Sequence, residues 1–202
     1  AGHEGVANYS DALSASSDGL ADDRLTNLQN GKQETYSVSE SMSQSRFLSF
    51  FGRLDYSSLD KYYFDASVRN DACSRFGVNN RNATFWAVGG MWKIKGEDFL
   101  YAVDAVNDLN FKVSYGTQGN ASIGNYQHLG LVSTVSKYMD TGAKVLSQPS
   151  NPGLTWEQQA LLTVGINGRF FNMLDVNIEF YNRTTTDMLM DVPYNYTTGF
   201  SS

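Results

Sequence analysis

Apolar and polar side chains alternate with a period of two along residues 45–69. Because successive side chains of a β-strand point to opposite sides, this period predicts two strands joined by a tight turn at 57–61. One face of this hairpin is apolar and rich in aromatic residues: Leu48, Phe50, Gly52, Leu54, Tyr56, Tyr62, Phe64, Ala66 and Val68. The other face carries mainly ions and hydroxyls, including Arg53, Asp55, Asp65 and Arg69, together with Phe47 and Phe51. We therefore expect a hairpin with one apolar side and one hydrated side.

The same alternation returns further along the chain. It predicts strands at 84–94, 109–115, 154–170 and 174–183, with a further strand near 128–135 and one or two helical turns within 96–109. Residues 1–33 are polar and weakly periodic, so we expect a long loop there. The predicted organisation is a loop and the start of a strand over 1–45, antiparallel strands with long loops at 70–83 and 116–153 over 46–192, and a loop tail over 193–202.

Two features of this pattern favour a transmembrane β-barrel. Long and shorter connections alternate along the chain: short at 57–61, long at 70–83, medium at 95–108, long at 116–153 and short at 168–173. Transmembrane barrels alternate short periplasmic turns with longer outer loops in this way. Trp86 and Trp92 flank an apolar stretch, as the aromatic girdles of such barrels do. The alternative is a soluble β-sandwich, in which the same aromatic face would meet a second sheet.

Composition agrees with either all-β fold. It argues against a helical membrane protein, a basic nucleic-acid-binding protein and a disulfide-bonded domain. The 202 residues contain no apolar run of the ~20 residues that a membrane helix needs, although short alternating barrel strands escape that criterion. The net charge is -6, of which -5 falls in residues 1–40, and an overall basic nucleic-acid-binding surface is absent. The single cysteine, Cys73, excludes an intrachain disulfide and a cysteine-based metal set. The chain begins without a signal peptide, and we expect it to be a fragment of a longer protein.

Ten short motifs occur in one order along residues 50–189. They are FFGRLDY (50–56), DKYYFDASVR (60–69), D-x-x-S-R-F-G (71–77), NNR (79–81), VGGMWKI (88–94), EDF (97–99), VNDLNFKVSYGTQGN (106–120), IGNY (123–126), LTWE (154–157) and FYNRTTTDML (180–189). Together they resemble the SusC/RagA-like TonB-dependent outer-membrane transporters of Bacteroidetes. The chain departs from the family at Ala72–Cys73, where Gly-Ser is usual, and at Trp86, where Pro is usual.

The resemblance implies a fold, a place and partners. The fold would be an all-β antiparallel up-and-down meander, part of a large transmembrane β-barrel of about 22 strands, without the family's plug domain. The place would be the bacterial cell outer membrane, with short turns on the periplasmic side and residues 1–45, 70–83 and 116–153 at the outer mouth. The implied function is import of oligosaccharides or peptides. The implied partners are the TonB system, a SusD-like surface lipoprotein, a glycan or peptide ligand and outer-membrane lipid, with no nucleic acid.

No catalytic set stands out in the sequence. His3 and His128 lie far apart, and neither belongs to a metal-binding pattern; no nucleophile elbow or phosphate-binding loop is present. We therefore expect no enzymatic activity, no metal and no cofactor, although a glycoside hydrolase with a carboxylate pair is a third possibility that geometry would decide. The candidate substrate-binding residues are polar and aromatic groups of the outer loops and upper lumen: Arg69, Asp71, Arg75, Asn79, Arg81, Asn120, Tyr126 and His128. The competing interpretation is that Arg69, Asp71 and Arg75 fix the fold of the loops.

Overall fold

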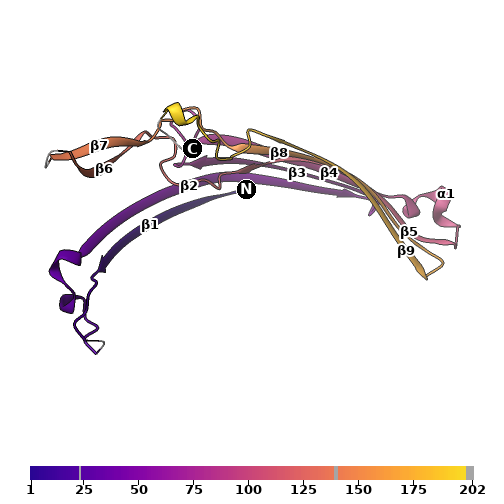
Figure 1. The fold of residues 1–202 in the computed structure, drawn as a ribbon. Helices are drawn as coiled ribbons and strands as arrows, with labels where there is room; N and C mark the ends of the chain where they lie inside the picture. Colours follow the sequence, from indigo (N-terminus) through magenta and orange to yellow (C-terminus); the bar gives the residue numbers. More distant parts are fainter. Residues whose placement is uncertain (23, 139–140, 199–202) are drawn as a thin grey trace.

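The computed structural model describes residues 1–22, 24–138 and 141–198, and almost all of its regular structure is β-strand (Figure 1). The strands are β1 (Gly2–Ser16), β2 (Ser37–Ser58), β3 (Tyr62–Cys73), β4 (Asn82–Lys93), β5 (Val106–Asn120), β6 (Leu131–Tyr138), β7 (Thr141–Gln148), β8 (Glu157–Phe170) and β9 (Leu174–Thr186). One short helix, α1 (Asp98–Tyr101), and four 3-10 turns (Leu28–Asn30, Gln33–Thr35, Ile94–Gly96 and Tyr196–Thr198) complete the described part. No helix within those residues is long and apolar enough to cross a membrane.

Seven strands form one antiparallel sheet in the order β1-β2-β3-β4-β5-β8-β9, and β6 pairs with β7 in a separate hairpin. Neighbours in the large sheet are neighbours in the chain except at β5 and β8, between which the small hairpin is inserted. The sheet is a single curved layer, and the hairpin of β6 and β7 projects from one end of it (Figure 1). This arrangement confirms the predicted all-β antiparallel meander.

The strand register places the apolar residues of successive strands on one side of the sheet. One row of mutually paired residues crosses six strands: Tyr56, Phe64, Gly90, Val113, Val164 and Phe180. We call this side the apolar face and the opposite side the polar face. A slip of one residue in any pairing would move that strand's apolar side chains to the polar face, so the sequence pattern strongly specifies this register.

A small core lies on the polar face at the end of the sheet near β6 and β7. Trp156 is 3% exposed, and its ring centroid lies 5.0 Å from that of Phe76 and 5.8 Å from that of Phe85. Phe47 of β2 closes the cluster at 6.0 Å from Trp156, and Cys73 is buried beside them. The Trp156 indole N–H donates to the carbonyl oxygen of Arg81 at 3.1 Å, so the only polar atom of the ring is satisfied. The connections 74–81 and 121–156 are folded over the sheet by this cluster.

The first strand corrects the expectation of a loop over residues 1–33. Gly2–Ser16 forms β1, which pairs with β2 along its whole length, and the first connection is 17–36. Pairing in the sheet, rather than local preference, produces this strand, because its residues include few of the β-branched and aromatic types that favour strands. Tertiary context therefore outweighs the weak local pattern.

The outer connections are also shorter than expected. β3 continues to Cys73 and β4 begins at Asn82, so only 74–81 remain between them, fewer residues than the 94–105 that join β4 to β5. The regular alternation of long and shorter connections therefore fails at this pair. Within 116–153, β5 runs to Asn120, and β6 overlaps the strand expected near 128–135. The predicted tail over 193–202 contains one 3-10 turn, and residues 199–202 lie outside the described part.

Strand β2 extends past the end of β3, and side chains from loops cover its free edge. The pairing with β3 stops at Phe47, so residues 37–46 pair only with β1. The backbone N–H of Arg46 donates to Ser74 Oγ at 2.9 Å, and the N–H of Ser74 donates to the carbonyl oxygen of Arg46 at 3.0 Å. The N–H of Gln44 donates to Tyr126 Oη at 2.9 Å. These contacts fix the loops after β3 and β5 against residues 44–46 of β2.

At the opposite end of the sheet, Glu97 links the turns after β2 and β4. Its Oε1 accepts from the Tyr62 hydroxyl at 2.7 Å and from the Trp92 indole N–H at 3.0 Å, and its Oε2 lies 3.5 Å from Lys61 Nζ. Bonds from Tyr62 and Trp92, followed by the charge of Lys61, hold the pKa of Glu97 below its ordinary value of 4.5. One carboxylate therefore positions two aromatic side chains of the apolar face.

Replacing Glu97 by glutamine is expected to give a pH-dependent loss of stability. A carboxyl whose folded pKa lies below its unfolded pKa stabilises the fold above the unfolded value, and this contribution is lost as the pH falls through the folded pKa. The unfolding free energy of Glu97→Gln in the full-length protein should therefore be lower than that of the native protein near pH 7. The difference should shrink below pH 4.5, the ordinary value of the group. Asp98→Asn, at an exposed neighbour, is the control; an equal pH dependence in both variants would contradict this role.

Candidate functional site

The polar face is hollowed between β2, β3, β4 and β5. The hollow has a volume of about 420 Å³ and is lined chiefly by Phe51, Arg53, Ser67, Arg69, Asp71, Phe85, Ala87, Gln118 and Gly119. Small residues shape it: a Cβ atom at Gly119 would collide with the ring of Phe85, and one at Gly116 would lie 2.7 Å from the Cβ of Ala87. The hollow thus offers two aromatic rings beside amide, hydroxyl and guanidinium groups, a combination that suits a polar organic ligand.

Arg69 lies at one side of this hollow, where its guanidinium joins three strands. Its Nε donates to Asp71 Oδ1 at 2.6 Å, and its Nη2 donates to Ser49 Oγ at 2.9 Å and to Glu4 Oε2 at 3.2 Å. The guanidinium also lies 5.7 Å from the ring centroid of Phe51, within cation–π distance. Asp71 is buried, so its charge needs such a partner. Arg69 and Asp71 therefore brace the strands β1, β2 and β3, whereas the competing interpretation assigned them to the fold of the loops.

Four other candidates from the sequence come together in a second hollow of about 460 Å³ at the loop end of the sheet. They are Arg75, Arg81, Tyr126 and His128. Arg75 donates to Asn125 Oδ1 and to the carbonyl oxygen of Ala121, both at 3.0 Å. The carbonyl oxygen of Arg75 lies 2.9 Å from His128 Nδ1, and a carbonyl only accepts, so this ring nitrogen carries the proton. These bonds hold the loop after β5 against the loop after β3.

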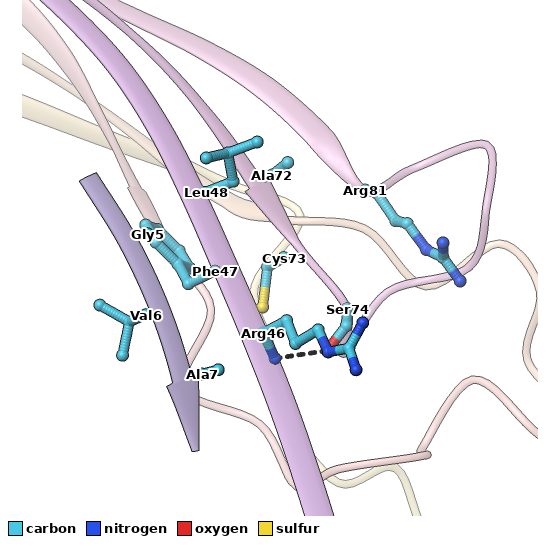
Figure 2. Close-up of a pocket in the computed structure, with 10 residues that line it drawn as sticks. All are labelled: Gly5, Val6, Ala7, Arg46, Phe47, Leu48, Ala72, Cys73, Ser74 and Arg81. Carbon is cyan, nitrogen blue, oxygen red and sulfur yellow. Dashed lines mark hydrogen bonds between the residues drawn. The ribbon is translucent and has the colours of Figure 1, made fainter. Parts of the chain in front are cut away.

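A third hollow, of about 410 Å³, adjoins the second one and shares three of its residues. Figure 2 shows Arg46, Ser74 and Arg81 at the margin of this hollow, with Leu48 and Ala72 on the strands beside them. Arg81 donates from Nε to the carbonyl oxygen of Phe76 at 3.4 Å. Arg46 and Arg81 both line this hollow and the second one.

The last two candidates lie apart from these hollows. Asn120 ends β5, where its Oδ1 accepts from the N–H of Ser122 at 2.9 Å. Asn79 is exposed at the tip of the connection between β3 and β4. The structure therefore distributes the eight residues over two hollows and two loop positions rather than one site. Whether any of them contacts a ligand stays a prediction.

Residues that the sequence did not single out complete the first hollow. Ser49 and Glu4 reach Arg69 only because β1 and β2 pair in a particular register, which no local pattern shows. Alternation placed Phe51 on the polar face, whereas Gln118 fell within the loop expected over 116–153, and nothing local indicates that the two surround one hollow. Within the described residues, no group of three or more His, Cys, Asp or Glu side chains could hold a metal ion.

Comparison with known proteins extends these observations. No family model matches the chain. "TonB-dependent receptor P26" of Formosa agariphila is 32% identical over 183 residues, which are 88% of this chain and 18% of that protein. "TonB-dependent receptor SusC" of Bacteroides thetaiotaomicron is 33% identical over 169 residues, covering 79% of this chain and 17% of that protein. The chain thus spans less than a fifth of the length of these curated relatives.

A solved structure matches nearly the whole chain. The structure titled "Structure of the RagAB peptide transporter" superposes with a TM-score of 0.90 at 41% sequence identity. The match covers 98% of this chain and 22% of that one. A second structure, titled as the same importer in the "open-open" state, matches with a TM-score of 0.85. The curved sheet described above is therefore a recurring part of a much larger chain.

Proposed function

Because this chain belongs to the SusC/RagA-like TonB-dependent transporters, as a segment of their β-barrel, we propose that it helps to import oligosaccharides or peptides across the bacterial outer membrane. The relatives are several times longer than the chain, so the transport activity is a property of the whole protein. The segment contributes seven strands to the barrel wall, with a lipid-facing and a lumenal side.

The exposure of the apolar face is the main support for this proposal. No second sheet among the described residues covers that face. Phe64 is 46% exposed, Val68 51% and Ile178 67%, although all three are on the side that a soluble sandwich would bury. The same exposure extends over β2, β4, β5 and β9: Leu48, Phe50, Leu54, Val88, Trp92, Val113 and Phe180. A contiguous apolar surface of this extent marks an interaction site, and lipid fits one that extends over five of the seven strands of the sheet. The soluble β-sandwich module is accordingly not favoured.

The connections give the orientation. Residues 17–36 and 121–156, the two longest connections, lie at the same end of the sheet, and the three-residue turns 59–61 and 171–173 lie at the other. In transmembrane barrels the long loops face outward and the short turns face the periplasm. The connections 17–36, 74–81 and 121–156 would therefore contribute to the outer mouth, and Glu97 would lie on the periplasmic side. This assignment rests on loop length at the two ends, since strict alternation fails between 74–81 and 94–105.

The polar face then borders the transport path. Its first hollow presents the rings of Phe51 and Phe85 beside Arg53 and Gln118, which suits contact with sugar or peptide groups during passage. The solved relative is titled a peptide transporter, which supports peptides as one cargo class. The energy source would be TonB, acting through parts of the longer protein, and a SusD-like surface lipoprotein would cover the outer mouth. The proposed role is transport, without a chemical reaction on the cargo.

Fractionation of cells that express the full-length protein tests this proposal. The protein is expected to sediment with outer membranes, to resist extraction by high salt and to be released by detergent, because its apolar face needs lipid or detergent. A known outer-membrane porin and a periplasmic protein serve as the two reference markers. Recovery in the aqueous fraction without detergent would overturn the transmembrane assignment.

A further inference from the structure

Arginine side chains gather without carboxylates at the margin of the second and third hollows. Arg46, Arg75 and Arg81 line the second hollow together with His128, and Arg46 and Arg81 also line the third. Neither hollow has an Asp or Glu among its lining residues. The region is therefore a concentrated positive charge on a chain whose net charge is -6.

Of the five other arginines, all but Arg183 form an ion pair within the described part of the chain. Arg24, Arg53, Arg69 and Arg169 each form an ion pair with an Asp or Glu at 3.2 Å or less. Within the part of the chain that the structure describes, no such pair is formed by Arg46, Arg75 or Arg81. The charge of these three guanidinium groups is thus left for a partner outside the segment.

Neutral acceptors nevertheless hold the three guanidinium groups in place. Arg75 is fixed by Asn125 and the carbonyl of Ala121, and Arg81 by the carbonyl of Phe76. The Arg46 Nη2 lies 3.0 Å from the side-chain amide of Gln44, which accepts when its oxygen is turned toward the guanidinium. Amide oxygens orient a guanidinium without neutralising it. Further N–H groups of each arginine remain for a bidentate acceptor.

The position of Arg46 indicates where the partner comes from. Arg46 precedes Leu48 by two residues on β2, so the alternation of the strand puts its side chain at the end of the apolar face, next to the exposed Leu48. The connections 74–81 and 121–156 that bring Arg75 and Arg81 beside it belong to the outer end of the sheet. Arg46 therefore lies at the outer margin of the lipid-facing band, where a membrane places its headgroups, and Arg75 and Arg81 line the hollow beside it.

We propose that Arg46, Arg81 and Arg75 bind a phosphate group of a lipid headgroup in the outer leaflet of the membrane; this inference rests on the proposed transmembrane location. A phosphate fits the geometry, because its oxygens accept paired N–H bonds from a guanidinium fork. Hollows of about 410 and 460 Å³ leave room for a headgroup phosphate and the sugar or glycerol that carries it. The carboxylate of a peptide cargo is a less suitable ligand, because Arg46 projects from the lipid side of the strand rather than from the lumenal side.

Binding of lipid A by the full-length protein in detergent micelles tests the inference. The probes are lipid A and its dephosphorylated form, which keep the same acyl chains and sugars, and bound lipid is quantified by native mass spectrometry. Arg46→Gln and Arg81→Gln are each expected to weaken lipid A binding about tenfold, since each removes charge-assisted hydrogen bonds. Arg24→Gln, which removes an arginine already paired with Asp22, is expected to bind like the native protein. Arg46→Lys should bind at an intermediate level, because it keeps the charge and loses the fork.

Several results would overturn the inference. Equal binding of lipid A and dephosphorylated lipid A, or native binding by both glutamine variants, would exclude phosphate recognition at this place. Displacement of lipid A by millimolar inorganic phosphate would assign the site to free phosphate instead of a lipid. Displacement by a peptide with a free carboxyl terminus, but not by its amidated form, would assign it to cargo. Because these variants should still sediment with outer membranes, failure here is separable from failure of the transmembrane assignment.

Discussion

Replacing Val113 by arginine is expected to prevent stable insertion of the barrel, whereas replacing the adjacent Ser114 by arginine is expected to be tolerated. Val113 belongs to the row of apolar residues that crosses six strands, and it is 40% exposed on the lipid-facing side. The row lies between the levels of Trp86 and Trp92, near the middle of the band. An arginine at the bilayer midplane of a barrel costs about 2–4 kcal/mol, and on the lumenal side this penalty is absent.

The two variants form a matched pair, because they put the same side chain on neighbouring residues of β5 with opposite orientations. The measurement is equilibrium unfolding by denaturant of the full-length protein in lipid vesicles. The folded fraction is read from the heat-dependent shift in gel mobility that folded barrels show. A lower unfolding free energy for Val113→Arg alone is the expected result. Similar losses at both positions would show that the two sides of the sheet do not face lipid and lumen as assigned.

Replacing Trp156 by alanine is expected to have the second large effect, centred on the loop end of the sheet. This side chain is 3% exposed and contacts Phe47, Phe76 and Phe85, so its removal leaves a cavity in the one compact cluster among the described residues. Truncation of a buried tryptophan typically costs about 3–5 kcal/mol. The cost should appear as opening of the connections 74–81 and 121–156, which this cluster holds on the sheet.

Limited proteolysis and unfolding of the full-length protein together measure this effect. Trp156→Ala should be cleaved faster within 121–156 and should unfold at lower denaturant concentration than the native protein. Trp156→Phe should lie between the two, since it keeps an aromatic ring and loses the bond to the Arg81 carbonyl. Tyr101→Ala is the control, because Tyr101 is 78% exposed at the other end of the sheet. Unchanged cleavage in Trp156→Ala would show that other contacts fix these loops.

The two faces of the sheet could be predicted because they depend on a local signal. Alternation over 45–69 and 84–94 is visible in the sequence. Pairing between these strands puts the apolar residues of each on the same side of the sheet. Strand β1 escaped prediction because its side chains carry little of that signal and its pairing with β2 supplies the order. The limits of 70–83 were also missed, since β3 and β4 continue into a region rich in turn-forming residues.

The candidate sites were harder to predict, because they depend on register and loop packing. Arg69 and Asp71 are two residues apart on one strand, so their pairing could be expected from alternation, although it braces strands and not the loops. The meeting of Arg75 with His128 joins residues from connections that are distant in the chain. Arg46 was not singled out at all, because an isolated arginine at the end of an apolar strand gives no signal until its neighbours in space are known.

The covered edge of β2 has a consequence for how copies of the protein behave toward one another. Residues 37–46 would present unpaired backbone groups beyond the end of β3, and such an edge is a template on which another chain can add a strand. Ser74 and Tyr126 occupy the hydrogen-bonding positions at Arg46 and Gln44. Loop side chains thus block the addition of a strand at these two positions, which lowers the tendency of copies of the protein to exchange strands at this part of the edge.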